Sequence, residues 1–495
     1  MSASNGTRIT TELSHDWRYQ PDLYHDGIRE GYASPEFNDH AWRQVSLPCL
    51  ADAVTPELAS FRGGIWFRRT VSSIQGDPAC VQLHIGGVVG RSQVYWDGVL
   101  VHEDRDCFLP ITIDLSGRTA PDRPHCLVIH IDNTCHPEDI PGQRLGWDMP
   151  CGIIRSVQLV AMATSHFETV RVTGGCEGSR GTVCAEVAAT MSAHAPLQAE
   201  LTVRSLDGRV CGTPICQVIS SGQPARIEAT IPDIQPWSPE SPTLYEVQLH
   251  LLENGQVIDT VSRRIGFRTI SWSKEGIFLN GNLIYLLGFN RHEDTHESGM
   301  VENPGRMRED LRAMKAMGCN FIRLAHYPHA ESTLDLCDEL GMLVLEEVPV
   351  YWWGGADDET SRQILEAGKR QLTRLIDRDR HHPSTLIWSV SNETTENLPH
   401  IIRGNAELIR HARTCDSTRP ITHVSTATRI TAETSVEDDV LCINDYPGIE
   451  AVKRAKYSPQ AAEAYWPTII AALRALYPDT PIVVTEFGYP AFHGI

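Results

Sequence analysis

The chain has 495 residues, more than one compact core usually holds, so several domains are expected. Its 43 Lys and Arg residues stand against 63 Asp and Glu residues, which gives a formal net charge of −20. This acidic balance argues against nucleic acid and against an anionic membrane surface as the main partner, and it sets no fold.

The N-terminus and the cysteines bear on the compartment. Residues 1–17 are polar, with no apolar stretch behind a positively charged end, so no signal peptide is predicted and a cytoplasmic location is expected. No run approaches the roughly 20 apolar residues that a membrane-spanning helix needs, so no membrane contact is expected. The 14 cysteines are scattered without a CxxC pair, which favours free thiols in a reducing compartment. A secreted form with a few disulfides stays open.

Residues 1 to about 270 predict two β-sandwiches. Short apolar or alternating runs recur there, and turn signals such as Asp97-Gly98 separate them. A break near residues 161–167 divides the runs into two series, so sandwich domains are expected at residues 1–162 and 163–270. The Pro-rich stretch 232–242 predicts a loop. The expected strands are 65–71, 81–85, 92–96 and 126–131 in the first series, and 169–172, 182–189, 197–205, 225–231 and 245–252 in the second.

From about Gly276 the pattern changes to an alternation of strands and helices. This alternation predicts a (β/α) barrel, with a domain at residues 271–495. The rival is a doubly wound open sheet, which would place a Gly-rich phosphate loop after its first strand. This chain has the polar segment Asn290–Asp294 there instead. The expected strands are 284–290, 319–325, 342–348, 386–391, 420–424, 440–444 and 481–485, and the expected helices are 304–317, 330–340, 361–378, 399–415 and 460–476.

Seven strands are one fewer than an eight-stranded TIM barrel contains. We therefore expect a (β/α)8 barrel that lacks its last strand–helix unit. Three explanations stay open: the sequence is a fragment, another chain closes the barrel, or the barrel is incomplete. Open sheet edges favour association, so a homo-oligomer is a further expectation.

Two glutamates end strands of this predicted barrel. Glu393 follows the fourth strand and Glu486 the seventh, and active sites of such barrels are built at the carboxyl ends of strands. Two converging carboxylates are what glycosidic bond cleavage needs: one protonates the leaving oxygen, and the other attacks the anomeric carbon or activates water. A lone Glu is more often a surface residue. The neighbouring Asn392, whose amide can hold a sugar hydroxyl, favours the functional reading.

Segments of both halves resemble glycoside hydrolase family 2, the family of β-galactosidases and β-glucuronidases. The barrel segments are GFNRHED at 288–294, NFIRLAHYP at 320–328, LCDELG at 336–341, WSVSNE at 388–393 and TEFG at 485–488, in the family's order. Gly64–Arg69, Trp96–Gly98 and Gly152–Arg155 resemble its N-terminal jelly-roll sandwich, and Ile265–Arg268 resembles the end of its immunoglobulin-like sandwich. The resemblance implies a sugar-binding-like jelly roll, an immunoglobulin-like domain and a catalytic TIM barrel.

The resemblance also implies roles for the two carboxylates in a retaining exo-β-glycosidase acting on a carbohydrate substrate. Glu393 would be the acid/base and Glu486 the nucleophile. The nucleophile must stay ionised, and Arg323 on the second strand is expected to depress its pKa. The acid must start protonated and then act as a base once the glycosyl-enzyme has formed.

No cofactor is required by this scheme, and no metal site is assigned. His292, Glu293 and Glu297 offer ligands for a cation, and some relatives in the family use one, but the spacing is not diagnostic.

Further strand-end residues are expected to contact the sugar. Asn392 would bind its 2-hydroxyl, and Tyr446 would hydrogen-bond Glu486. For the two histidines among them the alternative is to orient a carboxylate, and for the paired tryptophans it is loop packing. Asp445 has no assignment. The expected substrate-binding residues are Asn392, His292, Asp294, His326, Tyr446, Trp352 and Trp353.

The sequence places a β-galactoside ahead of a β-glucuronide. Arg291 stands where many glucuronidase relatives carry Lys, and Asp445 would disfavour an anionic sugar close to Glu486. The alternative from another class is a catalytically silent carbohydrate-binding or assembly protein on a truncated scaffold. The missing strand–helix unit supports that alternative, and the intact pair of carboxylates opposes it.

Overall fold

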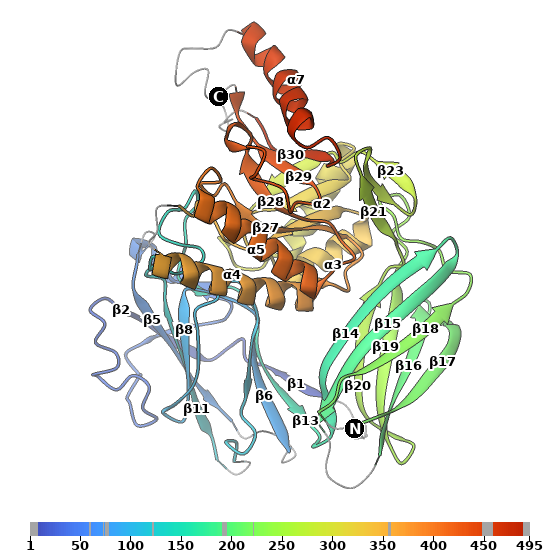
Figure 1. Cartoon of the computed structure of the whole chain (residues 1–495). Helices are drawn as coiled ribbons and strands as arrows, with labels where there is room; N and C mark the ends of the chain where they lie inside the picture. The colour runs from blue at the N-terminus through green and yellow to red at the C-terminus, as the bar shows by residue number, and fades with distance from the viewer. Residues whose placement is uncertain are drawn as a thin grey trace.

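The computed structural model describes residues 8–58, 61–72, 74, 79–120, 123–190, 196–220, 222–354, 358–447 and 459–488. Within these residues the chain forms two antiparallel β-sandwiches and one parallel sheet with helices, as predicted. Figure 1 shows both sandwiches on the same side of the parallel unit, the first in blue and the second in green. The limits predicted for the three domains stay a prediction.

The first sandwich contains β1 (Ile9–Glu12), β2 (Trp17–Asp22), β3 (Arg43–Val45), β4 (Cys49–Leu50), α1 (Ala51–Val54), η1 (Pro56–Leu58), β5 (Gly64–Val71), β6 (Cys80–Ile85), β7 (Val88–Val89), β8 (Arg91–Trp96), β9 (Val99–Asp104), β10 (Ile111–Asp114), β11 (His125–Asp132), β12 (Gly152–Ile153) and β13 (Val157–Met162). A sheet in the order β1-β13-β6-β10 packs on one in the order β3-β2-β5-β11-β8-β9. Alternate residues such as Leu83 and Ile129 are buried in its core. β5, β6, β8 and β11 confirm the predicted strands.

The second sandwich contains β14 (His166–Glu177), β15 (Arg180–Thr190), β16 (Leu197–Ser205), β17 (Val210–Ile219), β18 (Ala225–Ile231), β19 (Tyr245–Glu253) and β20 (Gln256–Ile265), in sheets β14-β15-β18 and β17-β16-β19-β20. The five predicted strands and the loop at 232–242 are confirmed. The sequence did not predict β17, because it contains Gly212 and Pro214 and is largely exposed. Trp237, in the predicted loop, is buried and donates from Nε1 to Asp338 O at 3.0 Å, which ties this sandwich to the parallel unit.

The expected strand at 284–290 is wrong as a single element. β21 (Ile270–Ser273), β22 (Gly276–Leu279) and β23 (Asn282–Ile284) form a small antiparallel sheet, and β24 (Gly288–Arg291) starts the parallel sheet. Between them the Asn320 side chain accepts from Leu287 N and donates to Tyr285 O, both at 2.9 Å. The apolar run is split because this amide takes the backbone groups that a continuous strand would have paired.

The parallel sheet runs in sequential order from β24 through β25 (Phe321–Leu324), β26 (Leu343–Glu347), β27 (Thr385–Asn392), β28 (Ile421–Thr426) and β29 (Leu441–Asn444) to β30 (Ile482–Glu486). The connecting helices are α2 (Pro304–Ala316), α3 (Glu331–Leu340), α4 (Asp358–Asp379), α5 (Pro399–Cys415), the short η2 (Ala427–Arg429) and α7 (Pro459–Leu476). The five predicted helices and the other six predicted strands are confirmed. Asn290 Nδ2 donates to Thr485 O at 2.9 Å, so β24 and β30 approach each other and the sheet is a nearly closed barrel.

Local sequence signals set the helix ends. The Asn303 side chain accepts from Arg306 N at 3.0 Å and Pro304 is the first helical residue, so α2 starts with a cap that its sequence supplies. α3 ends at Gly341, whose φ of +70° favours glycine. A Cβ at that position would lie 2.4 Å from Pro239 O, so the second sandwich also requires a glycine there.

Buried ion pairs join the first sandwich to the barrel. Arg155 Nη2 donates to Glu293 Oε2 at 2.8 Å and to Pro328 O at 3.0 Å. Asp106 accepts from Arg370 and from Arg374 of α4. The 14 cysteines are free thiols. In the described part of the chain, no helix is long and apolar enough to cross a membrane.

Arg155→Met should lower the free energy of unfolding by about 3–5 kcal/mol, because it leaves the Glu293 carboxylate buried without its partner. Urea denaturation followed by tryptophan fluorescence measures this loss. The double variant with Glu293→Met should regain part of it. Arg226→Met, in an exposed pair with Glu228, is the control and should leave the free energy of unfolding nearly unchanged. Equal losses in Arg155→Met and the control would contradict the role of the buried pair.

Candidate active site

Glu486 ends β30, and three side chains surround its carboxylate. Arg323 Nη1 and the Tyr446 hydroxyl donate to its two oxygens, and His326 Nε2 lies 3.9 Å from Oε1. Burial raises the pKa of Glu486, but Arg323, His326 and Tyr446 together outweigh burial and lower the pKa below its usual value. Glu486 is therefore ionised at neutral pH, as a nucleophile must be.

Glu393 directly follows β27 and has a φ of +46°. This left-handed backbone costs a non-glycine residue on the order of 1 kcal/mol, and the bond from Glu393 N to Val424 O at 2.8 Å holds it. The carboxylate accepts from Asn444 Nδ2 and from Trp352 Nε1, both at 3.0 Å. Both donors are neutral, so Glu393 has hydrogen bonds where Glu486 has an ion pair.

A short chain of hydrogen bonds connects the two glutamates. Asn392 Oδ1 accepts from Arg323 Nη2 at 2.7 Å and from Asn444 Nδ2 at 3.1 Å. Because Arg323 also binds Glu486 and Asn444 also binds Glu393, both carboxylates lie at one mouth of the barrel. Asn392 Nδ2 is buried and has no hydrogen-bond partner in the described part of the chain.

Arg323, on β25, is fixed by a second carboxylate. Its Nη2 donates to both oxygens of Glu347 at 2.9 Å, and Glu347 also accepts from Ser389 at 2.7 Å and lies 3.0 Å from His326 Nδ1. Burial alone would raise the pKa of Glu347, but Arg323 and His326 lower it to about 2. Glu347 stays charged, so it holds Arg323 beside Glu486.

Aromatic rings cover the two histidines. The Trp147 ring stacks on His326 with centroids 5.4 Å apart, and meets Tyr351 edge-on at 4.7 Å. His292 lies 5.7 Å from the same indole, and its Nδ1 is 3.2 Å from the Tyr327 hydroxyl. Burial, with a contribution from His326, lowers the pKa of His292 to about 4, so His292 is neutral at pH 7. Trp147 comes from the loop before β12, so the first sandwich contributes a wall of this site.

The two tryptophans predicted to contact the sugar lie in different surroundings. Trp352 donates to Glu393, whereas Trp353 is 4% exposed and packs in the apolar cluster between the barrel strands and helices α4 and α5. A Cβ on Gly404 of α5 would lie 2.4 Å from the Trp353 ring, so the ring fills that space and does not face the carboxylates. Of the acidic residues, Asp294 is exposed beside His292, and Asp445 accepts from the Tyr465 hydroxyl.

The three residues considered for a cation do not form a cluster. Glu293 is occupied by Arg155 and by the backbone N–H of Ala330, and Glu297 is exposed. Among the described residues, the group whose ligand atoms lie within 4.8 Å of one another is Asp335, Asp338 and His382, away from the barrel mouth. There Asp338 is paired with His382 at 2.6 Å.

Sequence reasoning missed four residues of this site. Glu347 ends an apolar strand, as Glu393 and Glu486 do, so its place in the pattern was a usable signal. Asn444 ends β29 and offered the same signal. Trp147 and Tyr351 lie in loops without a local pattern.

Glu396 lies three residues after Glu393 and is fully buried. Its two carboxylate oxygens accept no hydrogen bond from the described residues, and Arg429 Nη1 is 3.6 Å from Oε2. Burial raises the pKa of Glu396 to about 7, with a further contribution from Glu393 and opposition from His423 and Arg429. Glu396 therefore changes its charge near neutral pH.

Two sandwiches, a nearly closed parallel barrel and paired glutamates at its mouth define a multidomain architecture of the glycoside hydrolase type. A family model described as "Glycosyl hydrolases family 2, TIM barrel domain" matches residues 270–492, and one described as "Glycosyl hydrolases family 2" matches residues 165–268. The chain belongs to glycoside hydrolase family 2.

Curated relatives carry two activities in their names. A putative β-glucuronidase of Formosa agariphila is 31% identical over 72% of this chain and 43% of its own length. A β-galactosidase of Bacteroides ovatus is 27% identical over 79% of this chain and 47% of its own length. A β-glucuronidase of Paenibacillus borealis is 25% identical over 99% and 84%. The chain thus spans less than half the length of the first two relatives.

Solved structures share the fold. A β-glucuronidase from Ruminococcus gnavus, in complex with a C6-substituted uronic isofagomine, superposes with a TM-score of 0.87 at 22% identity. The match covers 100% of this chain and 86% of that one.

Glu396→Gln should change how stability depends on pH. In the folded chain the pKa of Glu396, about 7, exceeds its value of 4.5 in the unfolded chain, so the proton stabilises the fold below about pH 4.5 and this contribution is lost as pH rises through 7. Between pH 5 and 8, the variant should gain up to about 3 kcal/mol of unfolding free energy relative to the parent. Urea denaturation at each pH measures it. The exposed Glu433→Gln is the control, and parallel pH profiles of parent and Glu396→Gln would contradict the buried acid.

Proposed function

We propose that the chain is a retaining exo-β-glycosidase that removes terminal β-linked sugars. One observation carries the proposal: two glutamates at one barrel mouth have opposite surroundings, an arginine ion pair at Glu486 and neutral donors at Glu393. Carboxylates in unlike environments divide the work of nucleophile and acid between them.

In the first step, Glu486 attacks the anomeric carbon while Glu393 gives its proton to the glycosidic oxygen, and the aglycone leaves as an alcohol. The glycosyl ester with Glu486 has no carboxylate charge, so the environment of Glu393 becomes less negative and favours its role as a base. In the second step, Glu393 takes a proton from water, the water oxygen attacks the anomeric carbon, and Glu486 is released. No cofactor takes part.

Asn392 supports the assignment of the sugar site. Its Oδ1 is fixed by Arg323 and Asn444, so its amide plane is set, while the buried Nδ2 lacks a partner among the described residues. A buried donor without a partner is costly, and a sugar hydroxyl would satisfy it. We propose that this hydroxyl is the 2-hydroxyl. His326, His292, Tyr446 and Trp352 would contact the rest of the sugar, and the exposed Asp294 would bind its outer hydroxyls. We leave Trp353 out of the proposed site because its ring is buried against Gly404.

Two sugars are candidates. A β-galactoside remains one, because the guanidinium of Arg291 is already engaged by Asp310. Asp445 follows the same preference: its backbone N–H donates to Glu486 O at 3.0 Å, and its carboxylate accepts from the Tyr465 hydroxyl. A β-glucuronide is supported by the names of relatives from Formosa agariphila and Paenibacillus borealis. We therefore place the glucuronide level with the galactoside. The silent carbohydrate-binding alternative is tested by assaying this chain by itself, because it spans less than half the length of the first two relatives.

Purified protein should hydrolyse one of four 4-nitrophenyl β-glycosides (galactoside, glucuronide, glucoside or mannoside) with retention of the anomeric configuration. Proton NMR of the first sugar released measures that configuration. Glu486→Ala and Glu393→Ala should each lower kcat/KM by several orders of magnitude. With a 2,4-dinitrophenyl leaving group, which needs no proton, the first step should recover in Glu393→Ala and not in Glu486→Ala. Glu433→Ala is the control. Folded parent protein that cleaves none of the four would contradict the proposed activity on these sugars and favour the silent alternative.

Tyr446→Phe should move the acidic limb of the kcat/KM profile to higher pH. The Tyr446 hydroxyl helps lower the pKa of Glu486, and the nucleophile acts ionised, so losing the hydroxyl raises the pH at which activity appears, by up to about one unit. Initial rates at subsaturating substrate between pH 3 and 8 measure the limb. Tyr465→Phe, which removes the bond to Asp445, serves as the comparison. An unmoved limb in Tyr446→Phe would count against Glu486 as the group that sets it.

A further inference from the structure

A cavity of about 560 Å³ lies at the opposite end of the barrel from the paired glutamates. Its walls come from β14 and β15 of the second sandwich, from the segment 266–272 that leads into the barrel, and from residues 380–383 and 417–419. The last two segments precede β27 and β28, so this is the amino end of the barrel strands. The volume lies within the roughly 300–1,000 Å³ of small-molecule sites.

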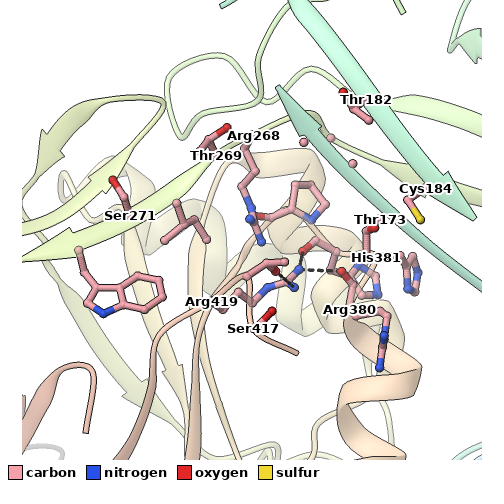
Figure 2. Close-up of a pocket in the computed structure, with 18 residues that line it drawn as sticks. Thr173, Thr182, Cys184, Arg268, Thr269, Ser271, Arg380, His381, Ser417 and Arg419 are labelled. Carbon is pink, nitrogen blue, oxygen red and sulfur yellow. Dashed lines mark hydrogen bonds between the residues drawn. The ribbon is translucent and has the colours of Figure 1, made fainter. Parts of the chain in front are cut away.

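The cavity wall is cationic. Arg268, Arg380 and Arg419 line it, and no Asp or Glu is among its lining residues, all of which are described. Figure 2 shows Arg268 and Arg419 next to each other in the middle of the view. Arg419 is paired with Asp416 at 2.6 Å and Arg380 with Asp377 at 2.7 Å, and both carboxylates belong to residues outside the lining.

Arg268 has no ion-pair partner among the described residues. It is 6% exposed, and its Nε and Nη2 donate to the carbonyl oxygens of Pro383 and Thr385. Burial lowers the pKa of Arg268 well below its usual value, and the charge of Arg419 lowers it further, against weaker opposition from Asp416. A buried guanidinium beside another guanidinium is destabilised unless an anion comes close.

Hydroxyl groups complete the lining. The side chains of Thr173, Thr182, Ser271 and Ser417 face this space and make no hydrogen bond to another described residue. Guanidinium groups bind carboxylate or phosphate, and a ring of hydroxyls binds the hydroxyls of a polar ligand. A carboxylate that could serve as acid or base is absent from the lining, so the cavity has the groups for binding and not those for glycoside hydrolysis.

We propose that this cavity is a second, non-catalytic site for a small hydroxylated anion, a molecule of monosaccharide size that carries a carboxylate or a phosphate. The oxyanion lies against Arg268 and Arg380, and its hydroxyls meet the threonines of β14 and β15. The ligand joins the second sandwich to the barrel, because its contacts come from both. This proposal goes beyond the glycosidase activity and does not depend on it.

The pairing of β14 with β15 identifies a position at which a substitution can test the cavity. Thr173 pairs with Cys184 and Gly175 pairs with Thr182 across β14 and β15, and all four residues line the cavity. Side chains at these positions share one face of the sheet. A Cβ added to Gly175 would meet nothing within 4 Å, so a longer side chain fits there and extends over the cavity.

The test is isothermal titration calorimetry of the full chain at low ionic strength with glucuronate, glucose 6-phosphate, inorganic phosphate and glucose. We expect glucuronate or glucose 6-phosphate to bind with a Kd in the millimolar range or below, at least tenfold more tightly than glucose and inorganic phosphate. Whichever of the two binds more tightly identifies the oxyanion. Binding of none of the anions, or equal binding of glucose, would overturn the proposal.

Two measurements place the bound ligand in this cavity. Gly175→Glu should weaken anion binding at least tenfold, whereas the matched neutral variant Gly175→Gln should change it less than threefold. In the parent chain, the ligand should slow maleimide labelling of the lining residue Cys184 and leave the exposed Cys216 unaffected, as read by peptide mass spectrometry. Equal effects of Glu and Gln at position 175, or unprotected Cys184, would overturn the site even where heat of binding is observed at the barrel mouth. Arg268 is not substituted, because its two bonds to backbone carbonyls also support the fold.

Discussion

The buried guanidinium of Arg323 is the contact on which the candidate active site depends. It binds Glu347 through both carboxylate oxygens, Asn392 through Oδ1, and Glu486 at the end of the last described strand. Burial alone would lower the pKa of Arg323, but the two carboxylates raise it, so the charge is permanent. A permanent buried cation with three directional partners fixes the relative positions of β25, β26, β27 and β30 more strictly than apolar packing does.

A stable core and a buried negative charge are requirements that conflict in most proteins. A buried ion pair contributes little net stability, because desolvation costs about as much as the attraction returns. Here Arg323 faces two carboxylates, those of Glu347 and Glu486, so the site keeps a net negative charge although it is largely buried. Such a charge suits the proposed nucleophile and is avoided in an ordinary hydrophobic core. The surrounding apolar clusters of the barrel supply the stability that this site does not.

The local sequence pattern predicted most strands and helices, and it predicted site residues only where they lie at or near the ends of predicted strands. The alternation of strands and helices located Glu393, Glu486, Arg323 and Tyr446, because the carboxyl ends of consecutive parallel strands must meet. The sequence failed where a side chain replaced a backbone partner, as Asn320 does beside β24, and where Pro214 interrupts the pattern of β17.

Other parts of the site left no local trace. Trp147 and His326 are nearly 180 residues apart in the sequence, and they meet because the first sandwich packs against the barrel. No periodicity within either segment predicts this contact. Burial of Trp353 was likewise decided by the space beside Gly404, which only the packed helices define.

The reach of Trp147 from the first sandwich into the barrel mouth also bears on how such a chain can change over time. A loop that covers the histidines of a neighbouring domain cannot be exchanged together with its own sandwich without altering the pocket. The surroundings of these histidines are therefore supplied by two domains, and a recombination event at the boundary between the domains would change them. The sandwich and the barrel are thus coupled at this site, although each has a hydrophobic core of its own.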